Sequence, residues 1–255
     1  MNTAMLPLAL RTQGLVRYFG GLKATNDVSF DIEPGELRAI IGPNGAGKTT
    51  LINLLTGELP VHEGRIFIGQ TDVTAQAIQQ RVGLGLLRSY QITSVFDAFT
   101  VFENVCLAAR RKQGVGFAVW KPLTAYGDVA ERARRVIEDC HLDEVKDVTA
   151  DSLAYGQRRQ LEIAMALAAD PRILLLDEPM AGMSAAEGAA AIQMLASLKG
   201  KYTILLVEHD MNAVFSLADR ISVLVYGSIV ATGTVDEIRN HPEVRRAYLG
   251  DDEDA

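Results

Sequence analysis

Glycines and a lysine stand at a fixed spacing between residues 42 and 49, and these residue types suit the binding of a phosphate chain. The segment reads G-P-N-G-A-G-K-T, fits the pattern G-x-x-x-x-G-K-[S/T], and lies between an apolar run and a segment of helical periodicity. Glycines permit positive φ and a close approach of backbone amides to phosphates. Lys48 would bridge the terminal phosphates, and Thr49 would offer a hydroxyl to Mg²⁺. The predicted phosphate-binding residues are Gly42, Pro43, Asn44, Gly45, Ala46, Gly47, Lys48, Thr49 and Thr50.

Two adjacent acids end a second apolar run, at residues 173–176. In parallel sheets, ligands bind at the carboxyl ends of strands, and adjacent strand residues point to opposite sides. We therefore expect Asp177 to face a metal ion and Glu178 to activate a water beside the terminal phosphate. Together with the glycine loop, these acids predict a nucleotide hydrolase. P-loop kinases, GTPases and motor ATPases share both features, but the guanine motif N-K-x-D is absent.

The runs that must position these residues alternate with helical patterns. Continuous apolar runs between helices predict a parallel sheet covered on both faces. Residues 15–21 and 28–36 instead alternate with period two and contain glycine and proline breaks, which predicts a smaller antiparallel layer. The runs assigned to the parallel core are residues 36–42, 65–69, 172–178, 202–208 and 220–226.

Strand signals are absent from about residue 93 to residue 150. Residues 101–111 and 128–142 place apolar side chains three and four apart, as amphipathic helices do, and a loop with three glycines separates them. We expect a helical subdomain at 93–150, inserted into a core made of residues 1–92 and 151–255. The predicted fold class is α/β, a P-loop NTPase with a parallel-sheet core, an antiparallel β subdomain and an inserted helical subdomain in one domain.

Composition limits which partners the protein can have and in which cellular compartment it works. The 255 residues carry a net charge of −7, with no basic field to hold a polyanion, so nucleic acid is not an expected partner. Two cysteines, Cys106 and Cys140, do not indicate a disulfide framework and are predicted to be buried thiols. No apolar stretch approaches the ~18 residues of a membrane span, and the first ten residues lack the charge order of a secretion signal. A cytoplasmic protein is expected.

A further segment, residues 152–160, reads S-L-A-Y-G-Q-R-R-Q and precedes an alanine-rich helical pattern, Asp170-Pro171 and the strand with the acids. This segment and the order of the motifs resemble the signature region of ABC-type ATPases. The resemblance extends from about residue 15 to residue 250. It implies ATP and Mg²⁺ as cofactors and ATP hydrolysis as the reaction.

The resemblance assigns further residues to the site. Phe19 resembles the aromatic residue that stacks on adenine, although the adjacent Tyr18 could be mistaken for it. Gln91 resembles the Q-loop glutamine, which reaches the metal and the attacking water, and His209 resembles the switch histidine that contacts the γ-phosphate. The implied catalytic residues are Lys48, Gln91, Glu178 and His209, and the implied metal ligands are Thr49, Gln91 and Asp177. The resemblance also implies that the signature residues of one subunit face the nucleotide bound to a second subunit; these residues are Ala154, Tyr155, Gly156 and Gln157.

Two departures from the family pattern narrow the subfamily. Ala154 stands where the signature usually has serine, so anion recognition there would rest on backbone N–H groups. Ser184 stands where the loop after the acids usually has aspartate. In these departures the chain resembles ATPases of branched-chain amino acid, amide or urea importers. The segment E-H-D-M at 208–211 and the tail at 242–250 support the same resemblance.

The resemblance implies two ATPase subunits arranged head to tail, as a homodimer or with a sister chain. It also implies membrane permeases, an external solute-binding protein that acts indirectly, and a place on the inner face of the cell membrane. Residues 92–101 are a candidate docking segment for a permease. Two alternatives remain open: an export or lipid-transport ATPase of the same fold, and a soluble, non-transport ABC protein working on nucleic acid. The transported substrate is not encoded in an ATPase subunit.

Overall fold

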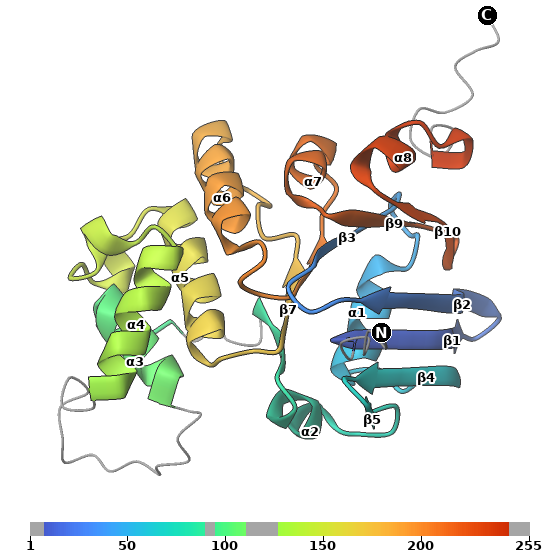
Figure 1. The fold of residues 1–255 in the computed structure, drawn as a ribbon, viewed down its shortest axis with the longest axis horizontal. Coiled ribbons are helices and arrows are strands. Elements are labelled where there is room, and N and C mark those ends of the chain that lie inside the picture. Colours follow the sequence, from blue (N-terminus) through green and yellow to red (C-terminus); the bar gives the residue numbers. More distant parts are fainter. Residues whose placement is uncertain (1–7, 90–94, 111–126, 245–255) are drawn as a thin grey trace, which may run out of the picture.

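The computed structural model describes residues 8–89, 95–110 and 127–244, which build two sheets and surrounding helices (Figure 1). The larger sheet has six strands in the order β10-β9-β3-β8-β7-β6. β3 pairs in parallel with β8 and β9, and β7 pairs in parallel with β8 and β6, whereas β10 is antiparallel to β9. The strands are β3 (Leu37–Ile41), β6 (Leu86–Arg88), β7 (Ile173–Asp177), β8 (Ile204–Val207), β9 (Arg220–Val225) and β10 (Ser228–Gly233). The predicted α/β fold with a parallel core is confirmed.

The central strands are apolar throughout because both faces of the sheet are covered. Every residue of β3 and β8 is buried. Successive residues of β7 enter two different clusters: Leu174 and Leu176 pack in one, and Ile173 and Leu175 in the other. Alternation of side chains across a strand thus fills two cores, one on each face.

The smaller sheet has four antiparallel strands in the order β2-β1-β4-β5. Its bounds are β1 (Leu10–Phe19), β2 (Leu22–Ile32), β4 (Glu63–Ile68) and β5 (Thr71–Asp72). The hairpin of β1 and β2 confirms the predicted antiparallel layer. The assignment of residues 65–69 to the parallel core is wrong, because β4 pairs antiparallel with β1. Its pattern, three exposed residues followed by alternating burial, fits a sheet with one wetter face.

Helix α1 (Lys48–Thr56) is held between the two sheets. Its residues Leu51, Ile52 and Leu55 share one apolar cluster with residues of β7 and β8 and with residues of the antiparallel sheet. This packing fixes the start of α1 directly beyond the carboxyl end of β3. The short helix α2 (Ile78–Gly83) follows the antiparallel strands and leads into β6.

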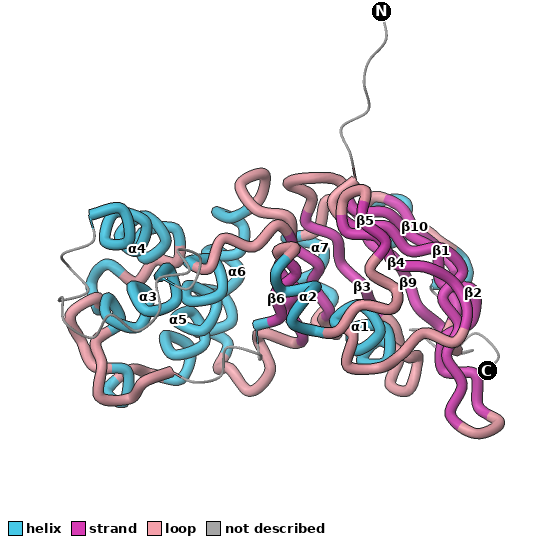
Figure 2. The backbone as a smooth tube through the Cα atoms, turned by 90° about the horizontal axis from the view of Figure 1, so that it is seen from below, coloured by secondary structure: helices cyan, strands magenta, loops and turns pink. Residues whose placement is uncertain are grey.

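The helices α3 (Val101–Arg110), α4 (Gly127–Asp139) and α5 (Tyr155–Ala168) pack together at one end of the molecule (Figures 1 and 2). Both predicted amphipathic helices are present as α3 and α4. Cys106 and Cys140 are buried free thiols, as expected, and burial raises the pKa of Cys106 to about 11. Because α5 packs on α3 and α4, the helical layer continues past residue 150; the domain boundaries remain a prediction.

The remaining helices follow the strands of the larger sheet. They are α6 (Ala185–Leu198), α7 (Met211–Leu217) and α8 (Val235–Arg239). Ser184 caps α6, Asp210 caps α7 and Thr234 caps α8, each through a side-chain oxygen that accepts a first-turn amide. Among the residues that the structure describes, no helix has the length and apolarity needed to cross a membrane.

Candidate active site

The loop between β3 and α1 takes a conformation that requires glycine. Gly45 and Gly47 have φ of 79° and 103°. A Cβ added at Gly47 would lie 2.4 Å from the carbonyl oxygen of Ala24, and one at Gly42 would lie 2.2 Å from that of Leu224. The loop is therefore pressed against β2 and β9, and larger residues do not fit at these two positions.

The N-terminus of α1 is left open for a ligand. Its N-cap is Gly47, which has no side chain that could accept a hydrogen bond from the first turn. Because the first amides of a helix have no intrahelical partner, this end offers N–H donors and a positive partial charge. The Thr49 side chain is exposed and Thr50 is half-buried, so the predicted hydroxyl ligand is accessible.

Lys48 is folded back onto the loop that precedes it. Its Nζ donates to the carbonyl oxygens of Gly42 at 2.6 Å and Pro43 at 3.2 Å. Burial lowers the pKa of Lys48, while the carboxylates of Glu178 and Asp177 act in the opposite direction. The structure thus places the lysine of the loop and the predicted acid pair within electrostatic reach of one another.

The two acids at the end of β7 have different surroundings. Asp177 forms an ion pair with the buried Arg88, with Nη2 and Oδ2 2.6 Å apart. Arg88 also donates to Asn53 of α1 at 2.8 Å. Glu178 has φ of 46°, a left-handed conformation that costs a non-glycine residue on the order of 1 kcal/mol, and its side chain is 44% exposed. One acid is held by the protein and the other faces the solvent, as two separate roles require.

His209 lies beside Glu178. Its Nδ1 is 3.7 Å from Oε1 of Glu178 and 3.7 Å from Oε2 of Glu208. Glu208 is buried and accepts hydrogen bonds from the amides of Met180 and His209. The Glu208 carboxylate therefore fixes both the turn after the acid pair and the loop that carries the histidine.

The residues present fit a magnesium nucleotide. Two glycine positions are closed to any Cβ, and an uncapped helix terminus follows them. Among the described residues, the Lys48 ammonium donates to loop carbonyls, and it stands beside two carboxylates. Thr49 and Asp177 supply the oxygen atoms that Mg²⁺ prefers. Gln91, the third predicted metal ligand, lies outside the described residues.

The two candidate aromatic residues for adenine differ in their contacts. Tyr18 packs against the His62 ring, with centroids 5.7 Å apart, while the Lys23 ammonium lies 5.6 Å from the Tyr18 ring. Phe19 is 45% exposed and has the Arg17 guanidinium 5.0 Å from its ring. Because β2 abuts Gly47 at Ala24, this hairpin and the phosphate loop are in contact.

The signature segment forms the start of α5. Ala154 is the N-cap, and its own N–H donates to Oε1 of Gln157 at 3.1 Å. Tyr155 donates its hydroxyl to the carbonyl of Ala181, and the Gly156 amide donates to Oε1 of Glu187 at 2.9 Å. The backbone N–H expected to recognise an anion thus already has an internal acceptor.

Sequence reasoning missed Arg88, Glu208 and Glu187. A single arginine in the apolar run before Gln91 was a signal for Arg88, because a buried arginine requires an acidic partner. An acid directly before His209 was a weaker signal for Glu208. Nothing local marked Glu187, whose partner at Gly156 lies 31 residues away in the chain.

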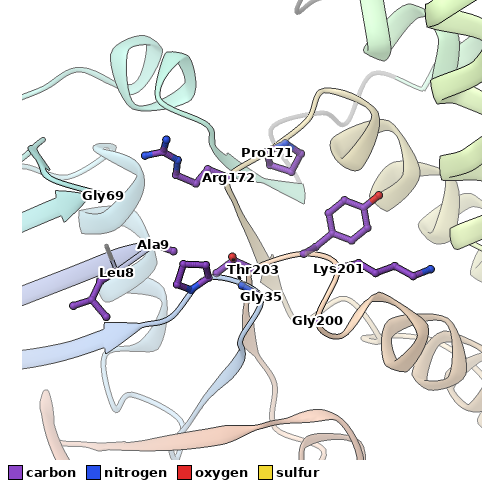
Figure 3. Close-up of a pocket in the computed structure, with 11 residues that line it drawn as sticks. Leu8, Ala9, Gly35, Gly69, Pro171, Arg172, Gly200, Lys201 and Thr203 are labelled. Atoms are coloured by element: carbon purple, nitrogen blue, oxygen red, sulfur yellow. Dashed lines mark hydrogen bonds between the residues drawn. The ribbon is translucent and has the colours of Figure 1, made fainter. Parts of the chain in front are cut away.

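A separate cavity of about 520 Å³ lies at the opposite end of the parallel strands (Figure 3). It is bordered by Gly35, Arg172 and Thr203, which immediately precede or lie close before β3, β7 and β8. None of the predicted nucleotide-binding residues lines it. The predicted site is therefore at the carboxyl edge of the sheet and is distinct from this cavity.

The carboxyl edge carries the parts of a P-loop nucleoside triphosphatase: the loop with its lysine, the histidine and the acids follow three neighbouring strands of one sheet, β3, β8 and β7. Comparison with known families agrees. The chain belongs to the ABC transporter family, whose model matches residues 25–181. A second model, described as branched-chain amino acid ATP-binding cassette transporter, matches residues 228–254. The predicted family resemblance and ATPase class are confirmed.

Relatives extend over nearly the whole chain. It is 39% identical over 249 residues to the high-affinity branched-chain amino acid transport ATP-binding protein LivG of Escherichia coli K12, covering 95% of this chain and 98% of LivG. It is 36% identical to BraF of Pseudomonas aeruginosa over 95% of this chain and 98% of BraF. A crystal structure of the ADP conformation of an ATP-binding cassette of an ABC transporter is 30% identical, with a TM-score of 0.80 and coverage of 95% and 99%.

Proposed function

We propose that this chain is the ATP-hydrolysing subunit of an importer for branched-chain amino acids or related small polar solutes, such as amides and urea. The observation that carries the proposal is the match of residues 228–254 to the branched-chain amino acid model, together with the ATPase site. LivG and BraF, which match over 98% of their length, are named as branched-chain amino acid transport ATP-binding proteins.

In this proposal, the nucleotide phosphates bind the amides at the start of α1 and the Lys48 ammonium. Lys48 would exchange its two loop carbonyls for phosphate oxygens, which are charged and therefore stronger acceptors. Thr49, Asp177 and Gln91 would hold Mg²⁺, which supplies positive charge to the transferring phosphoryl group. The ion pair with Arg88 keeps the Asp177 carboxylate at a fixed orientation.

Glu178 is the proposed base for the attacking water, and His209 is the proposed contact to the γ-phosphate. The left-handed backbone and exposure of Glu178 support this role, because the carboxylate can reach solvent on the side of the loop lysine. His209 lies close enough to Glu178 to orient it. Phe19 would stack on the adenine ring, an interaction worth roughly 0.5–1.5 kcal/mol.

A complete site would need a second ATPase subunit, either a copy of this chain or a sister chain. Figures 1 and 2 show α5 among the helices at one end and α1 beside the strands, so one chain's signature segment is remote from its own loop. In a head-to-tail dimer, the signature residues 154–157 of one subunit would face the nucleotide of the other. ATP would then stabilise the closed dimer, and hydrolysis would release it.

A permease contact is proposed at the segment before α3. The rings of Phe96 and Phe99 are exposed and stacked, with centroids 5.5 Å apart. Asp97, between them, forms an ion pair with Arg158 of α5, which connects this segment to the signature helix. Residues 92–94 of the predicted docking segment 92–101 lie outside the described part of the chain. These contacts support a subunit that works at the inner face of the membrane, with the solute-binding protein acting through the permease.

The test is to isolate the complex from membranes by a tag on this chain. We expect permeases of the importer type to be retained, and the solute-binding protein recovered with them to bind a branched-chain amino acid, an amide or urea. Recovery of an export-type permease, or binding of the purified chain to nucleic acid at physiological salt, would contradict the proposal. A Phe96→Ala, Phe99→Ala double variant should lose the permease and keep ATP binding.

A further inference from the structure

Glu187 uses both carboxylate oxygens to connect two helix starts. Oε2 accepts from the amide of Ser184 at 2.9 Å and from its hydroxyl at 2.7 Å. Oε1 accepts from the amide of Gly156, in the first turn of α5, at 2.9 Å. A carboxylate on α6 therefore lies at the N-terminus of the signature helix, which attracts anions.

Helix capping alone does not explain the second contact. Two other glutamates, Glu103 of α3 and Glu237 of α8, occupy the same third position of a helix and return to a capping threonine. In the described part of the chain, the hydrogen bonds of these two glutamates stay within their own capping boxes. Glu187 alone of the three also accepts from another helix. Its contact with Gly156 is additional to the capping function.

The surroundings hold the carboxylate in place. A Cβ at position 156 would come within 3.0 Å of Cβ and Cγ of Glu187, so glycine allows the approach. The Tyr155 hydroxyl donates to the carbonyl of Ala181 at 3.1 Å and connects the same turn to the loop after the acids. Hydrogen bonds from the Ser184 hydroxyl, the Ser184 amide and the Gly156 amide lower the pKa of Glu187, which is therefore charged at neutral pH.

We infer that Glu187 is a built-in anion that occupies the Gly156 amide in the single subunit and competes there with the terminal phosphate of the partner's ATP. This inference rests on the proposed head-to-tail dimer. An N–H group donates one strong hydrogen bond, and two anions at one helix terminus repel each other. Closure of the dimer must therefore move the carboxylate away from Gly156. The competition raises the nucleotide concentration at which two subunits associate.

Because Ala154 provides no hydroxyl, the amides carry more of the phosphate recognition than in a serine-containing signature. An occupied Gly156 amide consequently matters more in this chain. Glu187 also follows Glu178 by only nine positions, along the loop that Glu208 fixes at Met180. Release of the Glu187 carboxylate from Gly156 would couple the binding of the partner's nucleotide at the signature segment to the loop beside this subunit's own nucleotide.

The test compares Glu187→Gln with Glu237→Gln in the full-length chain. Glutamine keeps an oxygen that can cap the helix and removes the charge, and Glu237→Gln removes the same charge from a capping box far from the signature. Sedimentation velocity with a non-hydrolysable ATP analogue and Mg²⁺ measures the analogue concentration at half-dimerisation. We expect this concentration to fall about three- to tenfold for Glu187→Gln, the scale of one partly screened charge at a helix end, and to stay unchanged for Glu237→Gln.

The outcomes separate the two levels of the proposal. If wild type dimerises and Glu187→Gln does so at the same or a higher concentration, the competition is absent and the inference fails. If neither dimerises although calorimetry shows that the analogue binds, the proposed head-to-tail dimer fails and the inference with it. Thermal unfolding checks that both variants fold. Should Glu187→Gln not fold, Glu187→Asp keeps a capping carboxylate but shortens its reach to Gly156, and it must then also lower the half-dimerisation concentration.

Discussion

The N-termini of α1 and α5 face the same kind of ligand in the proposed mechanism but are built in opposite ways. α1 begins after Gly47 without a side-chain cap, in a loop where glycine is required by contacts to backbone carbonyls. α5 begins after Ala154, whose N–H donates to the Gln157 side chain, while the N–H of Gly156 donates to the Glu187 carboxylate. One helix start is left open, and the other is closed by the chain's own side chains.

This difference separates binding from closure. An open terminus with a lysine beside it can take up a nucleotide in a single subunit without breaking helix caps. A terminus closed by an internal carboxylate needs a conformational change first, so it suits a contact made only when two subunits meet. The account therefore predicts that changes around the start of α1 act on nucleotide binding and hydrolysis, whereas changes at the start of α5 act on the association of two subunits.

The largest effect is expected for Glu178→Gln. The amide keeps the size of the side chain but cannot accept a proton, so kcat should fall roughly 10²–10⁴-fold. Binding of the magnesium nucleotide should change little, because Lys48 and the loop are untouched. Steady-state ATPase rates and calorimetry on the same preparation check this, and hydrolysis at the wild-type rate would show that Glu178 is not the base.

The comparison becomes sharper with one alanine at each helix start. Gly47→Ala places a Cβ 2.4 Å from a backbone oxygen at φ of 103°, and about 2–5 kcal/mol of unfolding free energy should be lost. Gly156→Ala has no positive φ to strain it and meets Cβ and Cγ of Glu187 at 3.0 Å, a smaller overlap than at Gly47, so it should cost less than about 1.5 kcal/mol. Urea unfolding measures both, and equal costs would contradict the distinction.

Arg88→Met tests how Asp177, the acid proposed to face the metal, is held. Methionine fills much of the arginine volume but leaves Asp177 without its ion pair, so the Mg²⁺ concentration at half-maximal rate should rise about tenfold. Arg38→Met is the matched control, because Arg38 is also buried and pairs with Glu36, at the other end of the sheet. Both variants should lose stability. A shifted Mg²⁺ requirement in the control as well would contradict a specific role for Arg88.

The smallest effect is expected at Phe19, the residue proposed to stack on adenine. Phe19→Ala should raise the KM for ATP about two- to tenfold, the range that corresponds to a lost ring stack of roughly 0.5–1.5 kcal/mol. Tyr18→Phe should leave KM unchanged, because the Tyr18 ring already packs on His62 and Lys23. Steady-state kinetics at saturating Mg²⁺ measure both, and equal rises would contradict the assignment to Phe19.

The region around the start of α1, with the phosphate loop and Lys48, could be predicted from the sequence because its determinants are local. The loop, its lysine and the strand before it occupy consecutive residues, and their φ angles and burial follow from residue type. The sheet membership of β4 could not be predicted, since an apolar run does not specify its neighbour, and β4 pairs with β1 rather than with the parallel core. The short strand β6 was missed for a similar reason, because its three residues gain burial only by pairing with β7.

The region around the start of α5, which carries the signature segment, could be predicted only in part. The signature segment and its position before the strand of the acids were visible in the chain, and Ala154 and Ser184 were visible departures. The carboxylate at Gly156 was not, because Glu187 looks like an ordinary capping residue of α6 until the fold brings α5 beside it. Roles that depend on contacts across the fold, such as those of Arg88 and Glu208, were hidden in the same way.

The central claim is that the open start of α1, with Lys48, holds the phosphates of ATP. Calorimetric titration of the full-length chain with magnesium ATP, beside Lys48→Ala, tests it most directly. The account predicts saturable uptake by wild type and an affinity reduced at least roughly tenfold in the variant, as expected for the loss of a charge-assisted contact. Equal affinity in the two proteins, or no uptake by wild type, would contradict it.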